Sequence, residues 1–154
     1  MRRLYTGGGT VVFPTSSNEH GPVHSNGNGR VNGASQQARS VVYDAVSRQL
    51  IVTDVGDRST NEAEYLAIIR ALEHARDNAL HGVRVYTDSQ KCYFQITDKW
   101  PVRPMALGPL LETTRELLRS VDAEIAWIPP EENPAGHVAL GSATPNGYSS
   151  IANR

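Results

Sequence analysis

Val83-Arg84-Val85-Tyr86-Thr87-Asp88-Ser89-Gln90 is the stretch of sequence that decides the fold of this chain. Its first residues, rich in β-branched types, predict a buried strand that ends at the carboxylate of Asp88, before a helix-like segment. Upstream, Ser59-Thr60-Asn61-Glu62-Ala63-Glu64-Tyr65 predicts the start of another helix, with Glu64 in its first turn. A strand-end Asp and a helix-start Glu can converge on one cleft, so Asp88 and Glu64 form a minimal candidate site for a divalent metal ion.

Length and composition indicate one ordinary globular domain. The chain has 154 residues, which is enough to bury a full core as a single domain, 1–154. Its formal net charge of −1 excludes a global basic field, so any polyanion would bind through a local patch. The single cysteine, Cys92, excludes an intramolecular disulfide and fits a reducing, cytoplasmic location. No signal peptide or membrane span is apparent, no protein partner is indicated, and a monomer is the default expectation.

The pattern of apolar residues predicts alternating strands and helices. Strands are expected at 2–6, 40–43, 49–55, 83–87 and 123–128, and helices from about 60 to 80, at 89–100 and at 108–121. The triple glycine 7–9 is expected to break the first strand. Residues 14–37, rich in Gly, Asn and Ser, predict a long loop, and a frayed tail is expected from 141. This order predicts an α/β fold with a mixed sheet and helices on its faces.

Each of the two carboxylates has a functional and a structural interpretation. Asp88 would point into the crevice at the carboxyl end of its strand, or it would simply cap the next helix. Glu64 shares a helix face with Ile68, Ala71 and Ala75, which should pack on the sheet. A carboxylate at the end of that face is unfavourable unless it is paired, hydrogen-bonded or bound to a metal. The alternative is a first-turn Glu with its head in solvent, a role that fits Glu62.

A third informative stretch runs from Trp127 to His137. A strand leaves through Ile128-Pro129-Pro130 into a polar loop that reaches His137 at the start of another segment. Histidine is a metal ligand or a proton carrier near neutral pH, and the alternative is a surface residue without a ligand.

Taken together, these segments resemble the ribonuclease H type 1 family. The resemblance covers nearly the whole chain and rests on Leu4-Tyr5-Thr6-Gly7-Gly8-Gly9, Thr60-Asn61-Glu62-Ala63-Glu64-Tyr65, Tyr86-Thr87-Asp88-Ser89-Gln90 and the stretch from Trp127 to His137. It implies a ribonuclease H-like fold, a five-stranded mixed sheet flanked by helices. It also implies cleavage of the RNA strand of RNA/DNA hybrids by two divalent ions that four carboxylates hold.

The family pattern is only partly present. Carried over by position, Glu64 and Asp88 match two of the four metal-binding carboxylates, while Gly7 stands where the first-strand Asp should be. His137 occupies the position of the family's last metal-binding carboxylate, and the resemblance implies that it is an auxiliary ligand. Four further residues match positions that contact the nucleic acid or follow the motif carboxylate: Thr60, Asn61, Ser89 and Gln90.

These departures leave two functions open. The first is metal-dependent endonucleolytic hydrolysis of the RNA strand of RNA/DNA hybrids, with Mg²⁺ or Mn²⁺ as cofactor and Glu64, Asp88 and His137 as site residues. Imidazole suits Mn²⁺ better than Mg²⁺, so higher activity in Mn²⁺ is expected, and Gly7→Asp is expected to raise activity. The alternative is a catalytically impaired ribonuclease H-like nucleic-acid-binding module. A protein-binding scaffold with the same fold is a third interpretation.

Overall fold

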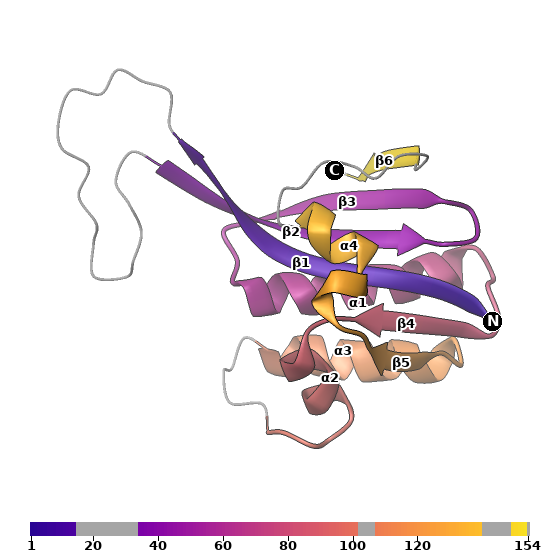
Figure 1. Ribbon diagram of the computed structural model, residues 1–154. Coiled ribbons are helices and arrows are strands. Elements are labelled where there is room, and N and C mark those ends of the chain that lie inside the picture. Colours follow the sequence, from indigo (N-terminus) through magenta and orange to yellow (C-terminus); the bar gives the residue numbers. More distant parts are fainter. Residues whose placement is uncertain (15–33, 102–106, 140–148, 154) are drawn as a thin grey trace, which may run out of the picture.

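The computed structural model describes residues 1–14, 34–101, 107–139 and 149–153, with side chains for 1–10, 37–101 and 107–139. Within these ranges the chain forms an α/β structure around a six-stranded sheet with the order β5-β4-β1-β2-β3-β6 (Figure 1). The strands are β1 (Arg2–Pro14), β2 (Ala34–Asp44), β3 (Gln49–Gly56), β4 (Val83–Thr87), β5 (Glu124–Trp127) and β6 (Ser149–Asn153). The helices are α1 (Thr60–Asp77), α2 (Gln90–Ile96), α3 (Leu107–Ser120), the single turn η1 (Pro130–Glu132) and α4 (Pro134–Ala139).

The sheet is mixed, as the sequence predicts. β1 lies at its centre, antiparallel to β2 and parallel to β4, and β4 pairs in parallel with β5. These strands and β3 are the five that the resemblance implies, and that prediction is confirmed. β6 adds a sixth strand, parallel to the edge of β3, within the tail that was expected to be frayed. The rest of that tail, 140–148 and 154, lies outside the described residues.

The prediction that the triple glycine ends the first strand is wrong. β1 continues to Pro14 because β2 pairs with every glycine, and the register places Gly7 opposite Val41 and Gly8 opposite Ser40. Beyond the ends of their neighbours β4 and β3, strands β1 and β2 continue together as a two-stranded ribbon that projects from the body (Figure 1). The loop expected at 14–37 is therefore shorter at its carboxyl end, since β2 begins at Ala34. Residues 15–33 lie outside the described part of the chain.

Helices cover both faces of the sheet. α1, α2 and α3 share one core with inward residues of β1, β2 and β4, including Leu4, Val42 and Val85. On the other face α4 packs on β1 and β2, where Ala135 and Val138 join a second core (Figure 1). None of the helices in the described ranges is long and apolar enough to cross a membrane.

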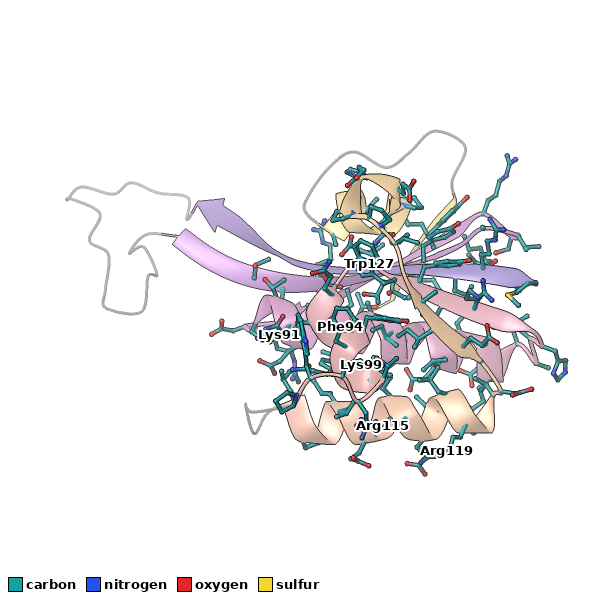
Figure 2. The ribbon with its side chains drawn as sticks, turned by 60° about the horizontal axis from the view of Figure 1, so that its bottom comes forward. Lys91, Phe94, Lys99, Arg115, Arg119 and Trp127 are labelled. Atoms are coloured by element: carbon teal, nitrogen blue, oxygen red, sulfur yellow. The ribbon has the colours of Figure 1, made fainter. Side chains whose placement is uncertain are left out.

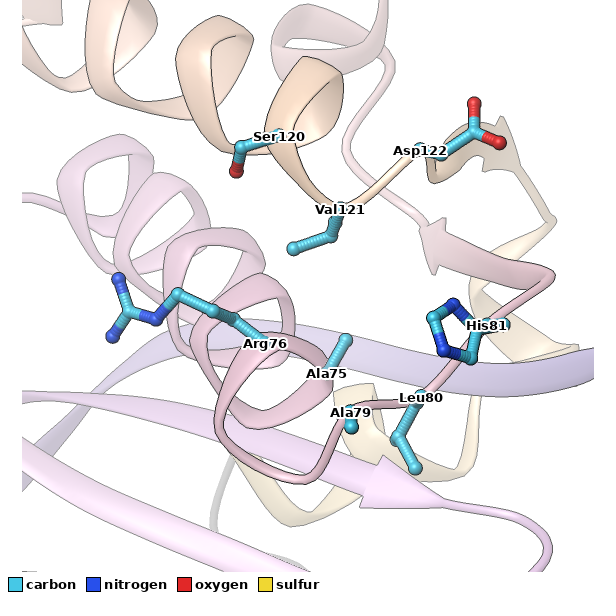
Figure 3. Close-up of a pocket in the computed structure, with 8 residues that line it drawn as sticks. All are labelled: Ala75, Arg76, Ala79, Leu80, His81, Ser120, Val121 and Asp122. Atoms are coloured by element: carbon cyan, nitrogen blue, oxygen red, sulfur yellow. The ribbon is translucent and has the colours of Figure 1, made fainter.

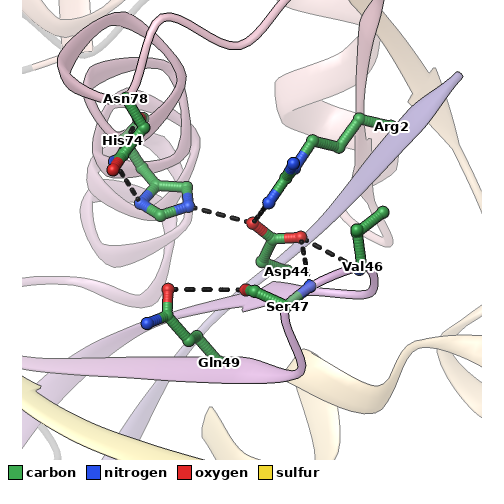
Figure 4. Close-up of polar contacts among 7 residues, drawn as sticks. All are labelled: Arg2, Asp44, Val46, Ser47, Gln49, His74 and Asn78. Atoms are coloured by element: carbon green, nitrogen blue, oxygen red, sulfur yellow. Dashed lines mark hydrogen bonds and ion pairs between the residues drawn. The ribbon is translucent and has the colours of Figure 1, made fainter.

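A buried ion-pair network fixes the start of β1 to the end of β2 and to α1 (Figure 4). Asp44 Oδ2 accepts hydrogen bonds from Arg2 Nη2 at 2.7 Å and from His74 Nε2 at 3.0 Å. Its Oδ1 accepts from the backbone amides of Val46 and Ser47. Burial raises the pKa of Asp44, but the bonds from Arg2, His74 and the two amides outweigh that effect and bring the pKa to about 2.

Candidate functional site

The first turn of α1 places Glu64 against the middle of β1. Ser59 is the N-cap of α1 and forms a capping box with Glu62, whose carboxylate also accepts from Arg58 and so is not simply in solvent as expected. The hydroxyl of Ser40 on β2 donates to the carbonyl oxygen of Ala63 at 2.7 Å and holds the helix start on the sheet. Glu64 follows directly and is only 7% exposed. The prediction that its face of α1 packs on the sheet is confirmed, and the solvent-exposed alternative is wrong.

The environment of Glu64 strongly disfavours its charge. Burial and then the nearby charge of Asp88 raise its pKa to about 8, although a hydrogen bond from the backbone N–H of Gly8 acts in the opposite direction. The second carboxyl oxygen, Oε2, is buried and has no hydrogen-bond partner in the described part of the chain. Buried polar atoms are normally satisfied, and a perturbed acid beside a second acid is typical of functional sites. The Glu64–Asp88 pair therefore needs an explanation beyond packing.

Asp88 lies half-buried at the carboxyl end of β4, where the sequence places it. Its Oδ2 accepts a hydrogen bond from Asn133 Nδ2 at 2.8 Å, and its backbone oxygen accepts from Trp127 Nε1 at 3.1 Å. Burial raises the pKa of Asp88, and the bond from Asn133 and the nearby His137 oppose that rise. The alternative that Asp88 caps α2 is wrong, because Ser89 is the N-cap and its hydroxyl accepts from the amide of Cys92.

Asn133 is a site residue that the sequence analysis missed. It is fully buried just before α4. Besides Asp88, its Nδ2 donates to the carbonyl oxygen of Thr6 on β1 at 2.9 Å, and its Oδ1 accepts from the amide of Ala135. An Asn directly before Pro134 at a helix start is a recognisable capping signal. Its bonds across to β1 and Asp88 depend on the fold and leave no local signal.

Two glycines bring α4 unusually close to β1 and β4. A Cβ atom on Gly7 would lie 2.7 Å from the carbonyl oxygen of Ala135 and 2.8 Å from the Cα of Gly136. A Cβ atom on Gly136 would in turn collide with Asp88 Oδ2. Both contacts are possible only because neither residue has a side chain. The backbone of α4 therefore fills the place toward which a side chain at position 7 would point.

His137 is exposed on α4, and it influences Asp88 electrostatically. Among the described residues, no group of three or more His, Cys, Asp or Glu is placed to hold a metal ion. The structure thus brings Glu64 and Asp88 together, but it does not join His137 to them as a third ligand of one ion.

The other predicted site residues lie near the carboxylate pair but differ in their surroundings. Thr60 is exposed, with its Oγ1 3.0 Å from that of Thr10 on β1. Asn61 is half-buried at the start of α1, and Gln90 is exposed at the start of α2. The hydroxyl of Ser89 is engaged in capping α2, so a structural role accounts for this residue.

A separate hollow of about 230 Å³ lies at the carboxyl end of α1 (Figure 3). It is formed by the segment that follows the end of α1, including Leu80 and His81, and by Val121 and Asp122 after α3. Ala75, which also lines it, is eleven residues beyond Glu64 on α1, or about 16 Å along the helix axis. This hollow is therefore not part of the Glu64–Asp88 site.

Comparisons with solved structures agree with this architecture. The chain is similar to RNase H1 from the halophilic archaeon Halobacterium salinarum NRC-1, with 22% identity, a TM-score of 0.63, and 90% of this chain and 92% of that chain covered. It is similar to LC11-RNase H1, isolated from compost and solved in complex with an RNA/DNA hybrid, with 19% identity, a TM-score of 0.62, and coverage of 94% and 96%. The N-terminal RNase H domain of rv2228c from Mycobacterium tuberculosis matches with 17% identity, a TM-score of 0.61, and 91% of each chain covered.

Sequence comparisons identify the family. No curated protein sequence matches significantly. Residues 21–140, more than half of the chain, match the family model described as reverse transcriptase-like. The chain therefore belongs to the reverse transcriptase-like family and has an RNase HI-like fold.

Proposed function

We propose that this protein hydrolyses the RNA strand of RNA/DNA hybrids at the Glu64–Asp88 pair. The observation that carries the proposal is the buried, unpartnered Oε2 of Glu64 beside the charge of Asp88, at the carboxyl end of a parallel strand. The likeness to LC11-RNase H1, which was solved with such a hybrid, supports the choice of substrate. The cytoplasmic location expected from the sequence stays a prediction.

The donor set of the pair fits a single divalent cation, Mg²⁺ or Mn²⁺. Glu64 and Asp88 would hold it, since hard cations prefer carboxylate oxygens. When bound, such an ion supplies Lewis-acid stabilisation of phosphate oxygens and activation of a water molecule. Gly8 and Asn133 each hold one carboxylate of the pair by a hydrogen bond. In this proposal His137, which is exposed, would pass a proton to the product as the product leaves, and the expected preference for Mn²⁺ stays a prediction.

A basic and aromatic surface beside the pair fits a nucleic acid. Figure 2 shows its members on α2, α3, the turn between them and the end of β5: Lys91, Phe94, Lys99, Arg115, Arg119 and Trp127. Arg115 is paired with the exposed acids Asp98 and Glu112, whereas Lys91, Lys99 and Arg119 form no ion pair within the described part of the chain. Trp127 is 36% exposed, and its indole N–H binds the backbone oxygen of Asp88. Phe94 is half-buried, so Trp127 offers the exposed ring on which a base could stack, and the cations without an ion pair suit phosphates.

The residues carried over from the family complete the proposed interface. Thr60, Asn61 and Gln90 flank the pair at the starts of α1 and α2, and they stay proposed contacts to the hybrid backbone. Ser89 contributes mainly as the cap of α2, although its position next to Asp88 keeps it at the edge of the interface.

The second candidate function is hybrid binding without turnover. The packing of α4 against Gly7 favours it, because it leaves no room for a third carboxylate on β1. Such a module would use the same surface and the same residues around the pair.

Cleavage of an end-labelled RNA/DNA hybrid by the purified protein tests the first candidate. We expect RNA fragments in Mg²⁺ or Mn²⁺ that disappear in Asp88→Asn and persist in Glu132→Gln, which changes an exposed acid outside the pair. If the wild-type protein binds the hybrid without cleaving it, the binding function is supported in place of the enzymatic one. No binding and no cleavage would overturn both.

A further inference from the structure

The site has few free donor atoms. Glu64 Oε2 is unpartnered and buried, while the other oxygen of that carboxyl accepts from Gly8. Asp88 Oδ2 is held by Asn133, which leaves Oδ1 for a ligand. The described residues offer no third His, Cys, Asp or Glu that would complete a cluster around an ion. One buried carboxylate oxygen and one half-buried one suit a single ion that water molecules help to coordinate.

Helix α4 closes the side of the site that faces β1. The backbone of Ala135 and Gly136 lies where any side chain on Gly7 would point, and Gly136 lies directly against Asp88 Oδ2. Asn133 fixes this arrangement by bonding Thr6 and Asp88 at once. The backbone of α4 therefore fills the space on the Gly7 side of the pair.

Charge leads to the same conclusion. Two carboxylates balance one dication, whereas two dications at ~3.5–4 Å from each other would carry four positive charges against two negative ones. Repulsion between the ions is weakly screened at a partly buried site.

We propose that the Glu64–Asp88 site binds one divalent cation per chain and that α4, seated on Gly7 and Gly136, excludes a second. This inference rests on the proposed function only in taking the pair to be a cation site.

The test is the stoichiometry of Mn²⁺ binding to the full chain, measured by isothermal titration calorimetry and by electron paramagnetic resonance of free Mn²⁺. The protein is first freed of metal with EDTA and then dialysed. We expect one Mn²⁺ per chain, an affinity lowered on the order of 100-fold by Asp88→Asn, and no change in Glu132→Gln. Gly7→Asp should not raise the stoichiometry to two, and Gly7→Ala shows what the added Cβ does without a ligand.

Each outcome bears on the inference separately from the proposed function. Two ions per wild-type chain, or two in a folded Gly7→Asp variant, would overturn the exclusion by α4 and leave hydrolysis intact. No binding at millimolar Mn²⁺, or binding that Asp88→Asn leaves unchanged, would overturn the cation site itself. One ion per chain without cleavage of the hybrid would uphold the inference and reject the enzymatic function.

Discussion

The side-chain amide of Asn133 donates to Asp88 Oδ2 at 2.8 Å and to the carbonyl oxygen of Thr6 at 2.9 Å. One buried residue thus joins the start of α4 to both β1 and β4, and it holds a carboxylate of the candidate site at the same time. The orientation of Asp88 and the seating of α4 therefore depend on each other.

Replacing Asn133 should weaken both the fold and the site. Asn133→Ala leaves the buried oxygen of Thr6 without its donor, so we expect the free energy of unfolding to fall by about 1–3 kcal/mol. Urea denaturation measures this change. Glu116→Ala truncates an exposed side chain in the middle of α3 and should change stability by less than about 0.5 kcal/mol. Equal effects of the two substitutions would contradict the role of Asn133.

Gly7→Asp should not restore a missing ligand. The sequence alone predicts that it would raise activity, but its Cβ atom would lie 2.7 Å from the backbone of Ala135. Because backbone must move to admit it, we expect Gly7→Asp and Gly7→Ala to destabilise the protein by roughly 2 kcal/mol or more and to raise neither cleavage nor cation binding. Gly108→Ala is the matched control, since its Cβ would meet nothing within 4 Å. A stable Gly7→Asp variant with raised activity would show that the contact with α4 is wrong.

The Asp44 network should make stability fall in acid. The pKa of Asp44 is lowered to about 2 in the folded state from 3.8, so its stabilising contribution is complete above pH 4 and is lost as the pH falls through 2. The shift corresponds to about 2 kcal/mol. Denaturation curves of the wild type and Asp44→Asn, measured at pH 7 and across pH 2–5, should differ most at neutral pH and converge in acid. A difference independent of pH would mean that Arg2 and His74 do not stabilise the charged form.

Ionisation of Glu64 should affect the pH dependence of stability in the opposite direction to that of Asp44. Its folded-state pKa is raised to about 8 from 4.5, so ionisation opposes folding and this contribution to stability declines as the pH rises from 4.5 to 8. Glu64→Gln removes the titration, and we expect its stability relative to the wild type to increase by on the order of 3 kcal/mol between pH 4 and pH 8.5. Thermal denaturation at both pH values measures this. A constant difference would show that the carboxyl is not held in a desolvated state.

The sequence predicts those parts of the molecule that local pattern controls. The strand before Asp88 and the apolar face that continues from Glu64 follow from residue spacing, and both are confirmed. The length of β1 could not be predicted, because pairing with β2 overrides the poor strand propensity of the triple glycine.

The contacts that shape the candidate site are long-range and leave little local signal. Asn133 reaches Thr6 across 127 positions of sequence. The packing of α4 on β1 depends on Gly7 and Gly136, which are far apart in sequence and come into contact only in the folded chain.

We propose that a divalent cation and an RNA/DNA hybrid meet on this protein at the Glu64–Asp88 pair. The most direct measurement is a crystal structure of the wild-type protein with a non-cleavable hybrid and Mn²⁺. The ion would be located by its anomalous scattering. We predict one Mn²⁺ between Glu64 and Asp88, with a phosphate of the RNA strand beside it and the hybrid lying over Trp127 and Lys99. A hybrid bound on another face, or a pair that holds no Mn²⁺ while the hybrid is bound, would contradict the account.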